Sequence, residues 1–462
     1  KSRHRQVYKL RIQVFFEFRK MDVIPISSEL INDLAREKGL PSPGTASIRE
    51  IVQLVNLIEK RTGIKFVRME MGVPGLQTPD IAIEAEIAAL KNGVTAIYPD
   101  ISGIESLKKE TSRFIKLFLN VDLKPGGCIP TVGSMMGGMV GFLVANRNDR
   151  TKEGTLFLDP GFPVQKQQVK MLGHDYYSFD IYNYRGKKLK DKLESFLKTG
   201  KISSLLYSNP NNPAWICLNE DELAIIGELC REYDVIVIED LAYFGMDFRK
   251  DYSAPGKPPY QPTVAHYTDD YILLISSSKI FSYAGQRIGM MAISDHLFNR
   301  SYPDLLRYYS SDKFGHSVIF GALYALSAGV SHSAQFGLAA LLKAVNDGIY
   351  NYRDDVMEYA EKAAIMKNLF VTNNFKIVYD RDLDDPLADG FYFTISYPGM
   401  TGRELLQELL SYGISAISLD ITGSERKEGL RACVSLVPRE QFGDLEIRLK
   451  KFNNDHPIRK NK

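Results

Sequence analysis

One stretch of the chain reads Tyr271-Ile-Leu-Leu-Ile-Ser-Ser-Ser-Lys-Ile-Phe-Ser-Tyr-Ala-Gly-Gln-Arg-Ile-Gly289. Its apolar first part predicts a buried strand that ends at a polar loop, where α/β folds place their chemistry. Lys279 stands in that loop, and Arg287 follows eight residues later. Partial burial lowers the pKa of an ammonium group, and such a lysine can attack a carbonyl carbon to form a Schiff base. Taken alone, the stretch still favours an ordinary surface lysine.

Length and composition indicate a soluble globular protein of two or three domains. The chain has 462 residues, of which 44% are hydrophobic, 25% charged and 11% aromatic, and these values argue against disorder. The formal net charge of +2 gives no electrostatic reason to expect a nucleic acid or an anionic membrane as partner. The most apolar run, residues 135–145, has about half of the ~20 residues that a spanning helix needs. We expect a buried helix there.

The cysteines predict neither a disulfide framework nor a metal site. Cys128, Cys217, Cys230 and Cys433 are scattered and form no CxxC pair. Such usage fits a reducing compartment, so we expect a cytoplasmic protein without a structural metal.

Residues 1–20 are expected to form an N-terminal extension outside the native protein. They contain seven Lys or Arg and one acid, Glu17, and charge interrupts their apolar residues, so they do not resemble a signal peptide. Met21 is then the expected biological start. The alternative is a basic arm that binds a partner.

Strand-like and helical segments alternate through the middle of the chain. Apolar strand patterns cover residues 155–159, 202–208, 234–240 and 271–276, and their alternation with helices predicts a largely parallel sheet covered on both faces. After about residue 335 a long polar helix is followed by alternating strands, which predict a smaller α+β unit with a one-sided sheet. We therefore expect residues 21–77 and 346–462 to form a small domain and residues 78–345 a large one.

Four polar loops each follow an apolar strand. They hold Gly133-Ser134, the Asn-Pro turn from Asn209, then Asp240, and Lys279. Glycine and serine at a helix start leave backbone N–H groups free for an anion, although glycines also serve close helix packing. Because ligands of such sheets bind at the carboxyl ends of the strands, these loops are candidates for one common site.

Together these residues resemble the class I and II aminotransferases of fold type I, which use pyridoxal 5′-phosphate (PLP). The similarity extends from about Met69 to Arg431. It implies an α/β fold with a mostly parallel seven-stranded sheet between helices, plus a smaller α+β domain. It also implies a ping-pong Schiff-base reaction that moves an amino group between an L-amino acid and a 2-oxo acid.

The resemblance implies a role for each matching residue at the cofactor phosphate. Lys279 is the Schiff-base lysine, which also shuttles the substrate α-proton. Ser276 and Arg287 match phosphate ligands, and Gly133, Ser134 and Met135 match the phosphate loop. Met135 replaces the hydroxyl or amide residue often found there, so only its backbone is expected to bind.

Other matches concern the cofactor ring. Asp240 would pair with the pyridine nitrogen, and Tyr243 and Asn212 would hydrogen-bond the ring hydroxyl. Phe162 would stack on the ring, and Tyr98 would reach the phosphate of a neighbouring subunit, which implies a homodimer with shared active sites. The family often continues Asn-Pro with Thr-Gly, whereas Ala214-Trp215 follows here, so the turn is expected to differ.

At the substrate, Arg431 matches the arginine that binds the α-carboxylate, while Gly72 and Asn212 also match substrate-binding positions. The amino donor stays open, with acidic and aromatic amino acids both considered and residues 302–314 a candidate lining of the side-chain pocket. A β-lyase, decarboxylase or synthase of the same fold is the alternative enzyme. A catalytically silent PLP-binding sensor is the alternative outside catalysis.

Overall fold

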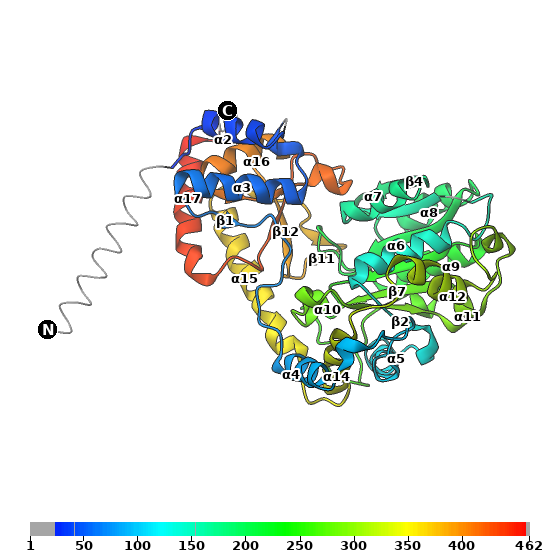
Figure 1. The fold of residues 1–462 in the computed structure, drawn as a ribbon. Helices are drawn as coiled ribbons and strands as arrows, with labels where there is room; N and C mark the ends of the chain where they lie inside the picture. The colour runs from blue at the N-terminus through cyan, green and yellow to red at the C-terminus, as the bar shows by residue number, and fades with distance from the viewer. Residues whose placement is uncertain (1–23, 41, 153, 459–462) are drawn as a thin grey trace.

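The computed structural model describes residues 24–40, 42–152 and 154–458. The proposed extension, residues 1–20, lies outside these ranges. The described chain forms two lobes (Figure 1), a larger one built on a seven-stranded sheet and a smaller one built on a four-stranded sheet. No helix in these ranges is long and apolar enough to cross a membrane.

The larger sheet is parallel except for one strand. Its order is β2 (Cys128–Thr131), β8 (Gly289–Ile293), β7 (Tyr271–Ser276), β6 (Ile236–Leu241), β5 (Ile202–Ser208), β3 (Gly154–Asp159) and β4 (Tyr176–Asp180). Strand β8 pairs antiparallel with both of its neighbours. The mostly parallel seven-stranded sheet expected from the sequence is therefore confirmed.

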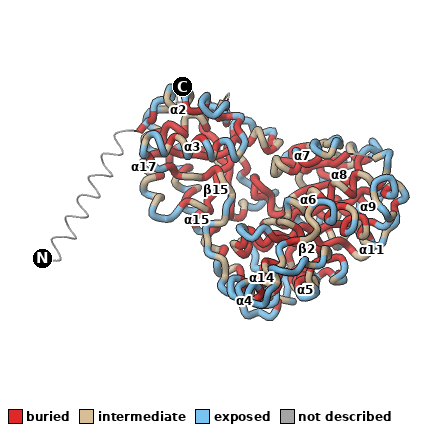
Figure 2. The backbone as a smooth tube through the Cα atoms, in the orientation of Figure 1, coloured by how far each residue is buried: buried red, intermediate tan, exposed pale blue. Residues whose placement is uncertain are grey.

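Helices cover both faces of this sheet, so the inner strands are buried throughout (Figure 2). One face packs against α6 (Gly133–Ala145), α7 (Pro163–Met171), α11 (Asp295–Asn299), α12 (Phe314–His316) and a π-helical turn (Ser317–Leu323), which continues into the short α13 (Tyr324–Leu326). The other packs against α5 (Glu105–Leu119), α8 (Lys188–Leu197), α9 (Glu220–Glu232) and α14 (His332–Asn346), with α4 (Asp80–Lys91) against α14. The short α10 (Ser277–Ile280) continues directly from β7.

The smaller lobe combines both ends of the chain. Its antiparallel sheet has the order β14 (Ile417–Ser418), β15 (Leu430–Cys433), β12 (Tyr392–Ser396) and β9 (Lys376–Ile377). The N-terminal part contributes α2 (Ser28–Glu37), α3 (Ile48–Thr62) and β1 (Val67–Arg68), which pairs with β13 (Ile414–Ser415). The C-terminal part adds α15 (Tyr352–Thr372), α16 (Gly402–Ser411) and α17 (Phe442–Asp455).

The expectation of a one-sided sheet in this lobe is wrong. All residues of β12 and β15 are buried. The polar members of these strands, such as Thr394 and Arg431, are covered as completely as their apolar neighbours. Helix α15 packs against β12, and α16 packs against β14 and β15. Alternating polarity here marks side chains that are bonded inside the protein, not a solvated face.

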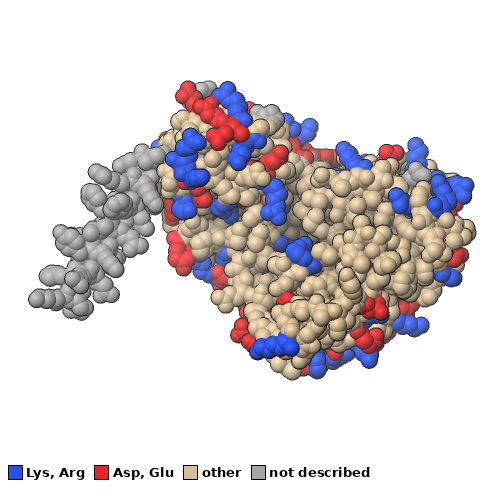
Figure 3. All heavy atoms as spheres, in the orientation of Figure 1, with Lys and Arg blue, Asp and Glu red and all other residues tan. Residues whose placement is uncertain are grey.

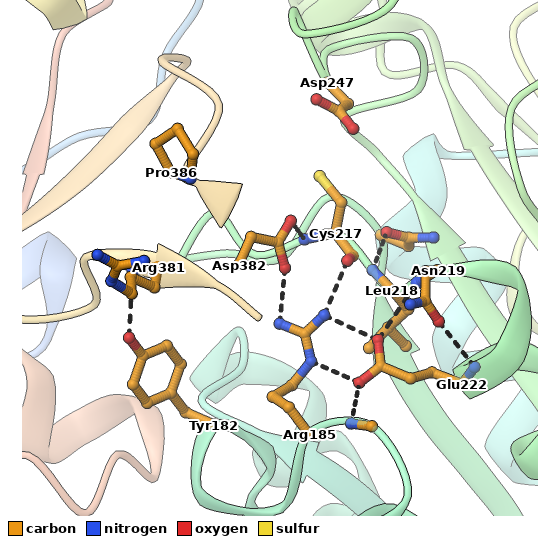
Figure 4. A network of polar contacts seen from close by, with 12 residues as sticks. Tyr182, Arg185, Cys217, Leu218, Asn219, Glu222, Asp247, Arg381, Asp382 and Pro386 are labelled. Atoms are coloured by element: carbon orange, nitrogen blue, oxygen red, sulfur yellow. Dashed lines mark hydrogen bonds and ion pairs between the residues drawn. The ribbon is translucent and has the colours of Figure 1, made fainter. Parts of the chain in front are cut away.

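A hairpin of the smaller lobe is joined to the larger lobe by buried ion pairs (Figure 4). The hairpin consists of β10 (Arg381–Asp382) and β11 (Asp385–Pro386). The Arg185 guanidinium lies between Asp382, at 2.7 Å, and Glu222, also at 2.7 Å. Arg249 binds the second oxygen of Asp382 at 2.7 Å. These contacts hold the hairpin against the larger lobe.

Candidate active site

Four of the predicted loops meet at the carboxyl ends of the parallel strands. Asp240 is the penultimate residue of β6, Asn212 follows β5, and Lys279 lies in α10 directly after β7. Gly133 opens α6 after β2. The smaller lobe adds Arg431 from β15 and Gly72 from the segment after β1. The site therefore lies between the two lobes.

Lys279 is half-buried and faces the smaller lobe. Its Nζ donates a hydrogen bond to the carbonyl oxygen of Gly72, and the ring centroid of Phe391 lies 5.2 Å away. Burial lowers the pKa of the Lys279 ammonium to about 8, and the Arg431 and Arg287 guanidinium groups act in the same direction. A lysine tuned this way has a substantial neutral fraction near neutral pH, as a nucleophile requires.

The start of α6 has the features of an anion-binding site. Gly133 has a φ of 66°, and a Cβ there would lie 2.6 Å from Arg287 Nη2, so the missing side chain lets the guanidinium approach the helix terminus. A Cβ on Gly289 would lie 3.1 Å from the Ser134 backbone nitrogen, and Gly289 pairs with Ser276 across β7 and β8. Free backbone N–H groups, a helix dipole and an arginine together favour a phosphate.

Asp240 is a buried carboxylate held by neutral donors. It is 7% exposed, Gln165 Nε2 donates to Oδ2 at 2.8 Å, and the Ala242 backbone N–H donates to Oδ1 at 3.1 Å. Burial raises the pKa of Asp240 to about 6, and the two hydrogen bonds oppose that rise. In the described ranges no cation lies within ion-pair distance, so the carboxylate is free to pair with a protonated ring nitrogen.

Gln165 extends this part of the site to α7. Its backbone N–H donates to the carbonyl oxygen of Phe162 at 3.2 Å, and Phe162 is the N-cap residue of the helix. The predicted stacking residue therefore stands one turn before the side chain that holds Asp240.

Arg431 is a buried cation with open hydrogen-bonding capacity. The residue is 2% exposed. Its Nη2 donates to the Glu70 carbonyl oxygen at 2.6 Å, its Nη1 donates to Asn212 Oδ1 at 3.4 Å, and its Nε is buried without a partner. None of the described carboxylates lies within ion-pair distance of it. Because a buried charge is costly unless it is paired, the site is suited to an anionic ligand.

Tyr243 meets a residue that the sequence did not point to. Its hydroxyl lies 2.8 Å from the hydroxyl of Tyr392. A Cβ on Gly72 would overlap that same Tyr392 hydroxyl, so the bare backbone of Gly72 fits against it. The motif search missed Tyr392, Phe391 and Gln165 because each makes its contact across a long sequence separation.

Two predicted positions, Tyr98 and Tyr302, are not brought to this site within one chain. Tyr98 is 92% exposed. The Met135 side chain is exposed as well, but only its backbone is expected to bind, and that backbone lies in the first turn of α6 beside Gly133 and Ser134. Tyr302 lies near Arg300, which pairs with Asp234 at the start of β6. That is the opposite edge of the sheet from Lys279.

A separate cavity of about 890 Å³ lies beyond the Asn-Pro turn. Asn209, Arg249 and Asp382 are among its lining residues, and none of the predicted site residues is. The convergence of Lys279, Asp240 and Arg431 defines the candidate site better than the size of that cavity does.

Comparison with known proteins agrees with this geometry. Residues 64–443 match the sequence model of the family "Aminotransferase class I and II". A probable aspartate aminotransferase of Methanocaldococcus jannaschii is 25% identical over 235 residues, which are 50% of this chain and 58% of the relative. An LL-diaminopimelate aminotransferase of Natranaerobius thermophilus is 25% identical over 332 residues, 71% of this chain and 79% of the relative. The match thus spans little more than half the length of the first of these relatives.

Solved structures share the fold. An aspartate aminotransferase of Thermus thermophilus superposes with a TM-score of 0.71 at 15% identity, covering 88% of this chain and 97% of the other. An alanine aminotransferase of Pyrococcus furiosus superposes with a TM-score of 0.71 at 20% identity, covering 89% and 98%. The fold-type I architecture is therefore confirmed. With the family match over residues 64–443, these findings show that the chain belongs to the class I and II aminotransferases.

Proposed function

We propose that this protein is a PLP-dependent aminotransferase that moves an amino group between an L-amino acid and a 2-oxo acid. One observation carries the proposal: the buried guanidinium of Arg431, without a carboxylate partner, shares a site with a lysine whose pKa is lowered to about 8. The first group suits a substrate carboxylate and the second suits an aldehyde carbon.

The residues of the site fit PLP. The Gly133 turn, Ser134, Ser276 and Arg287 would hold the phosphate, because backbone N–H groups, hydroxyls and a guanidinium converge there. Asp240 would hold the ring nitrogen, and Phe162 would cover one ring face. When bound, PLP supplies an electron-withdrawing ring that stabilises negative charge at the substrate α-carbon.

The protein's own groups would divide the remaining work. Arg431 binds and orients the substrate carboxylate, and Asn212 supports that arginine through its side-chain oxygen. Lys279 would take the proton from the substrate α-carbon and deliver it to the aldehyde carbon of the cofactor. Asp240 keeps the ring nitrogen protonated because a buried carboxylate next to a ring N–H favours the charged pair. The Tyr243 hydroxyl would donate a hydrogen bond to the ring oxygen.

A homodimer with shared active sites is part of this proposal. Tyr98 is 92% exposed and Ile97 is 63% exposed, and helix α4 nearby leaves Ile83, Ile87 and Leu90 exposed. Figure 3 shows that most of the facing surface of the larger lobe carries neither acid nor base. A surface with few charges that exposes several large apolar side chains suits a subunit interface. Light scattering should give twice the chain mass, and a monomer that retains full activity would refute this part.

A cytoplasmic location is also proposed, because Cys128, Cys217, Cys230 and Cys433 are all free thiols.

The test of function is a comparison of products. Purified protein loaded with PLP is incubated with individual amino acids and 2-oxoglutarate, and 2-oxo acid, glutamate, ammonia, sulfide and carbon dioxide are measured. Transamination predicts equal amounts of new 2-oxo acid and glutamate. Release of ammonia, sulfide or carbon dioxide without glutamate would indicate a lyase or decarboxylase. Loss of all turnover in Lys279→Ala, with Lys343→Ala unchanged as surface control, would assign the reaction to this site.

No turnover with any amino acid, despite cofactor binding, would indicate a silent sensor.

A further inference from the structure

The turn after Asn212-Pro213 holds an unusual tryptophan. Trp215, the only tryptophan of the 462 residues, has a φ of 60°, a left-handed conformation that favours glycine. Its side chain is nevertheless fully buried. A Cβ on Gly390 would overlap the indole, so the glycine before β12 leaves the space that the tryptophan fills. The contacts of the buried ring must therefore offset the free-energy cost of the strained Trp215 backbone.

Trp215 packs against two tyrosines of the site. Its ring centroid lies 5.3 Å from that of Tyr243 and 6.1 Å from that of Tyr392, both edge-on. The centroids of the two tyrosines lie 5.5 Å apart. Edge-to-face rings at these separations attract one another beyond their burial. The three rings form one cluster behind the site.

Tyr392 touches both halves of the site. Its hydroxyl lies 2.8 Å from that of Tyr243, the predicted partner of the cofactor ring oxygen. Its ring centroid lies 4.7 Å from the guanidinium carbon of Arg431, the predicted carboxylate-binding residue. A guanidinium over an aromatic face is held by the ring quadrupole without being neutralised. The ring thus supports the cation and leaves its hydrogen-bonding edge to a ligand.

We propose that Tyr392 is a positioning residue with two separable parts: its hydroxyl orients Tyr243 toward the cofactor, and its ring holds Arg431 ready for the substrate carboxylate. Trp215 supports it by fixing both tyrosine rings. The proposal rests on the proposed function, because it assigns the work of Tyr243 and Arg431 to a PLP site.

The direction of the hydrogen bond between the Tyr243 and Tyr392 hydroxyls decides which of the two can donate to a ligand. Burial raises the pKa of both phenols, to about 12 for Tyr392, so both hydroxyls are protonated at neutral pH. Each hydroxyl has its own proton, and one of these two protons forms the hydrogen bond between the oxygens. If Tyr392 donates that proton, Tyr243 keeps its own for a ligand, and a donor that also accepts is strengthened. The titratable groups facing the pair are Arg431 and Cys433, both on β15.

The variant Tyr392→Phe separates the two parts, because it removes the hydroxyl and keeps the ring. A Tyr243 hydroxyl that donates less strongly to the ring oxygen stabilises the deprotonated imine less. The midpoint of the pH-dependent visible absorbance of the PLP-loaded protein should therefore rise by roughly half a pH unit, the effect of one neutral hydrogen bond. The KM for the amino donor should change less than twofold, since Arg431 keeps its aromatic support.

The variant Tyr392→Leu removes the ring as well. It should raise the KM for the amino donor about tenfold over that of Tyr392→Phe, the loss of a buried cation–π contact. The emission of Trp215, the single tryptophan, should shift in Tyr392→Leu and stay constant in Tyr392→Phe, in the cofactor-free protein too. This readout is independent of turnover.

Tyr352→Phe is the matched control. The Tyr352 hydroxyl is also buried and donates one hydrogen bond, to the Tyr252 carbonyl oxygen at 3.0 Å. Its loss should lower the melting temperature as much as Tyr392→Phe does and leave the absorbance midpoint unchanged. An equal midpoint in wild type, Tyr392→Phe and Tyr352→Phe would overturn the proposal.

A double variant protects the test from a general structural disturbance. In a Tyr243→Phe background, adding Tyr392→Phe should not move the midpoint further, because the hydroxyl acts through Tyr243. A further shift of full size would overturn that route. If the wild-type protein shows no absorbance from a lysine-bound cofactor, the proposed function itself fails. If it does and Tyr392→Phe titrates identically, only this inference fails.

Discussion

Two buried arginines lie on opposite sides of the junction between the lobes, and they differ in what neutralises them. The Arg185 side chain is 6% exposed and lies between Glu222 and Asp382, both at 2.7 Å. Arg431 is 2% exposed, donates hydrogen bonds only to neutral oxygens of the chain and lies over the neutral ring of Tyr392. The charge of the first arginine is neutralised within the fold, whereas we propose that a bound anion neutralises the second. This contrast separates a structural charge from a binding charge.

The largest expected effect comes from removing the binding charge. Arg431→Gln should lower kcat/KM for the amino donor by a hundredfold to a thousandfold, the loss of about 3–4 kcal/mol of a charge-assisted pair with the substrate. The melting temperature should stay the same or rise, because an unpaired buried cation is removed. Steady-state kinetics and thermal unfolding check both parts. Arg431→Lys keeps the charge but cannot form the bidentate contact, so its kcat/KM should lie between those of the wild type and Arg431→Gln.

Removing the structural charge should have the opposite pattern. Arg185→Gln leaves the buried carboxylate of Glu222 without a cation and leaves Asp382 with Arg249 alone, so it should lower the free energy of unfolding by about 3–5 kcal/mol. The KM of the folded fraction should change little. Chemical denaturation checks the first part, and Arg381→Gln, an exposed arginine of the same hairpin, is the control that should unfold like the wild type. A large KM effect without destabilisation would break the contrast.

Lys279 adds a pH dependence to the binding side. With a pKa of about 8, its neutral fraction, and so the rate of PLP capture by the cofactor-free protein, should rise about tenfold from pH 7 to pH 9 and then level off. A lysine with an ordinary pKa would show no plateau below pH 10. Stopped-flow absorbance measures the rate, and Lys279→Ala should show no capture. A rate that still rises steeply above pH 9 would contradict the lowered pKa.

The smallest effect concerns Asp240, the buried anion without a cation. Gln165 donates to its charged form, so Gln165→Leu should raise the pKa of Asp240 above about 6 and move the acid limb of kcat/KM upward by about one pH unit. Gln165→Leu should therefore lose activity at a higher pH than the wild type does as the solution is acidified, because its Asp240 carboxylate is protonated at a higher pH. Gln167→Leu, exposed on the same helix, should leave the limb in place. An acid limb that stays in place in both variants would show that Gln165 does not lower the pKa of Asp240.

The convergence of Lys279, Asp240 and Gly133 could be predicted because each signal is local. Each of these residues lies at or just after the end of an apolar strand, and the order of a parallel sheet brings such strand ends together. Tyr392 could not be found that way, since its partners lie 149 residues away at Tyr243 and at Arg431 on the paired strand. The change to Ala214-Trp215 indicated an altered turn, and the structure shows the indole that fills it.

The pairing of buried charges was equally hidden from sequence. Arg185 and Asp382 are separated by 197 residues, and neither belongs to a motif. The one-sided sheet was predicted wrongly for a related reason: alternation along a strand records polarity, but it does not tell whether a polar side chain meets water or a partner across the domain. Arg431 is such a case, because it is polar, buried and directed at the site.

Reduction with borohydride can show which lysine forms the bond to the cofactor. The protein is incubated with PLP, reduced with borohydride and digested, and the modified peptide is identified by mass spectrometry. A parallel sample receives an excess of an amino donor before reduction. We expect a reduced cofactor bonded to Lys279 and to no other lysine, and loss of that label after the amino donor has converted the cofactor to its amine form. A label on another lysine, or one that no amino acid removes, would contradict this expectation.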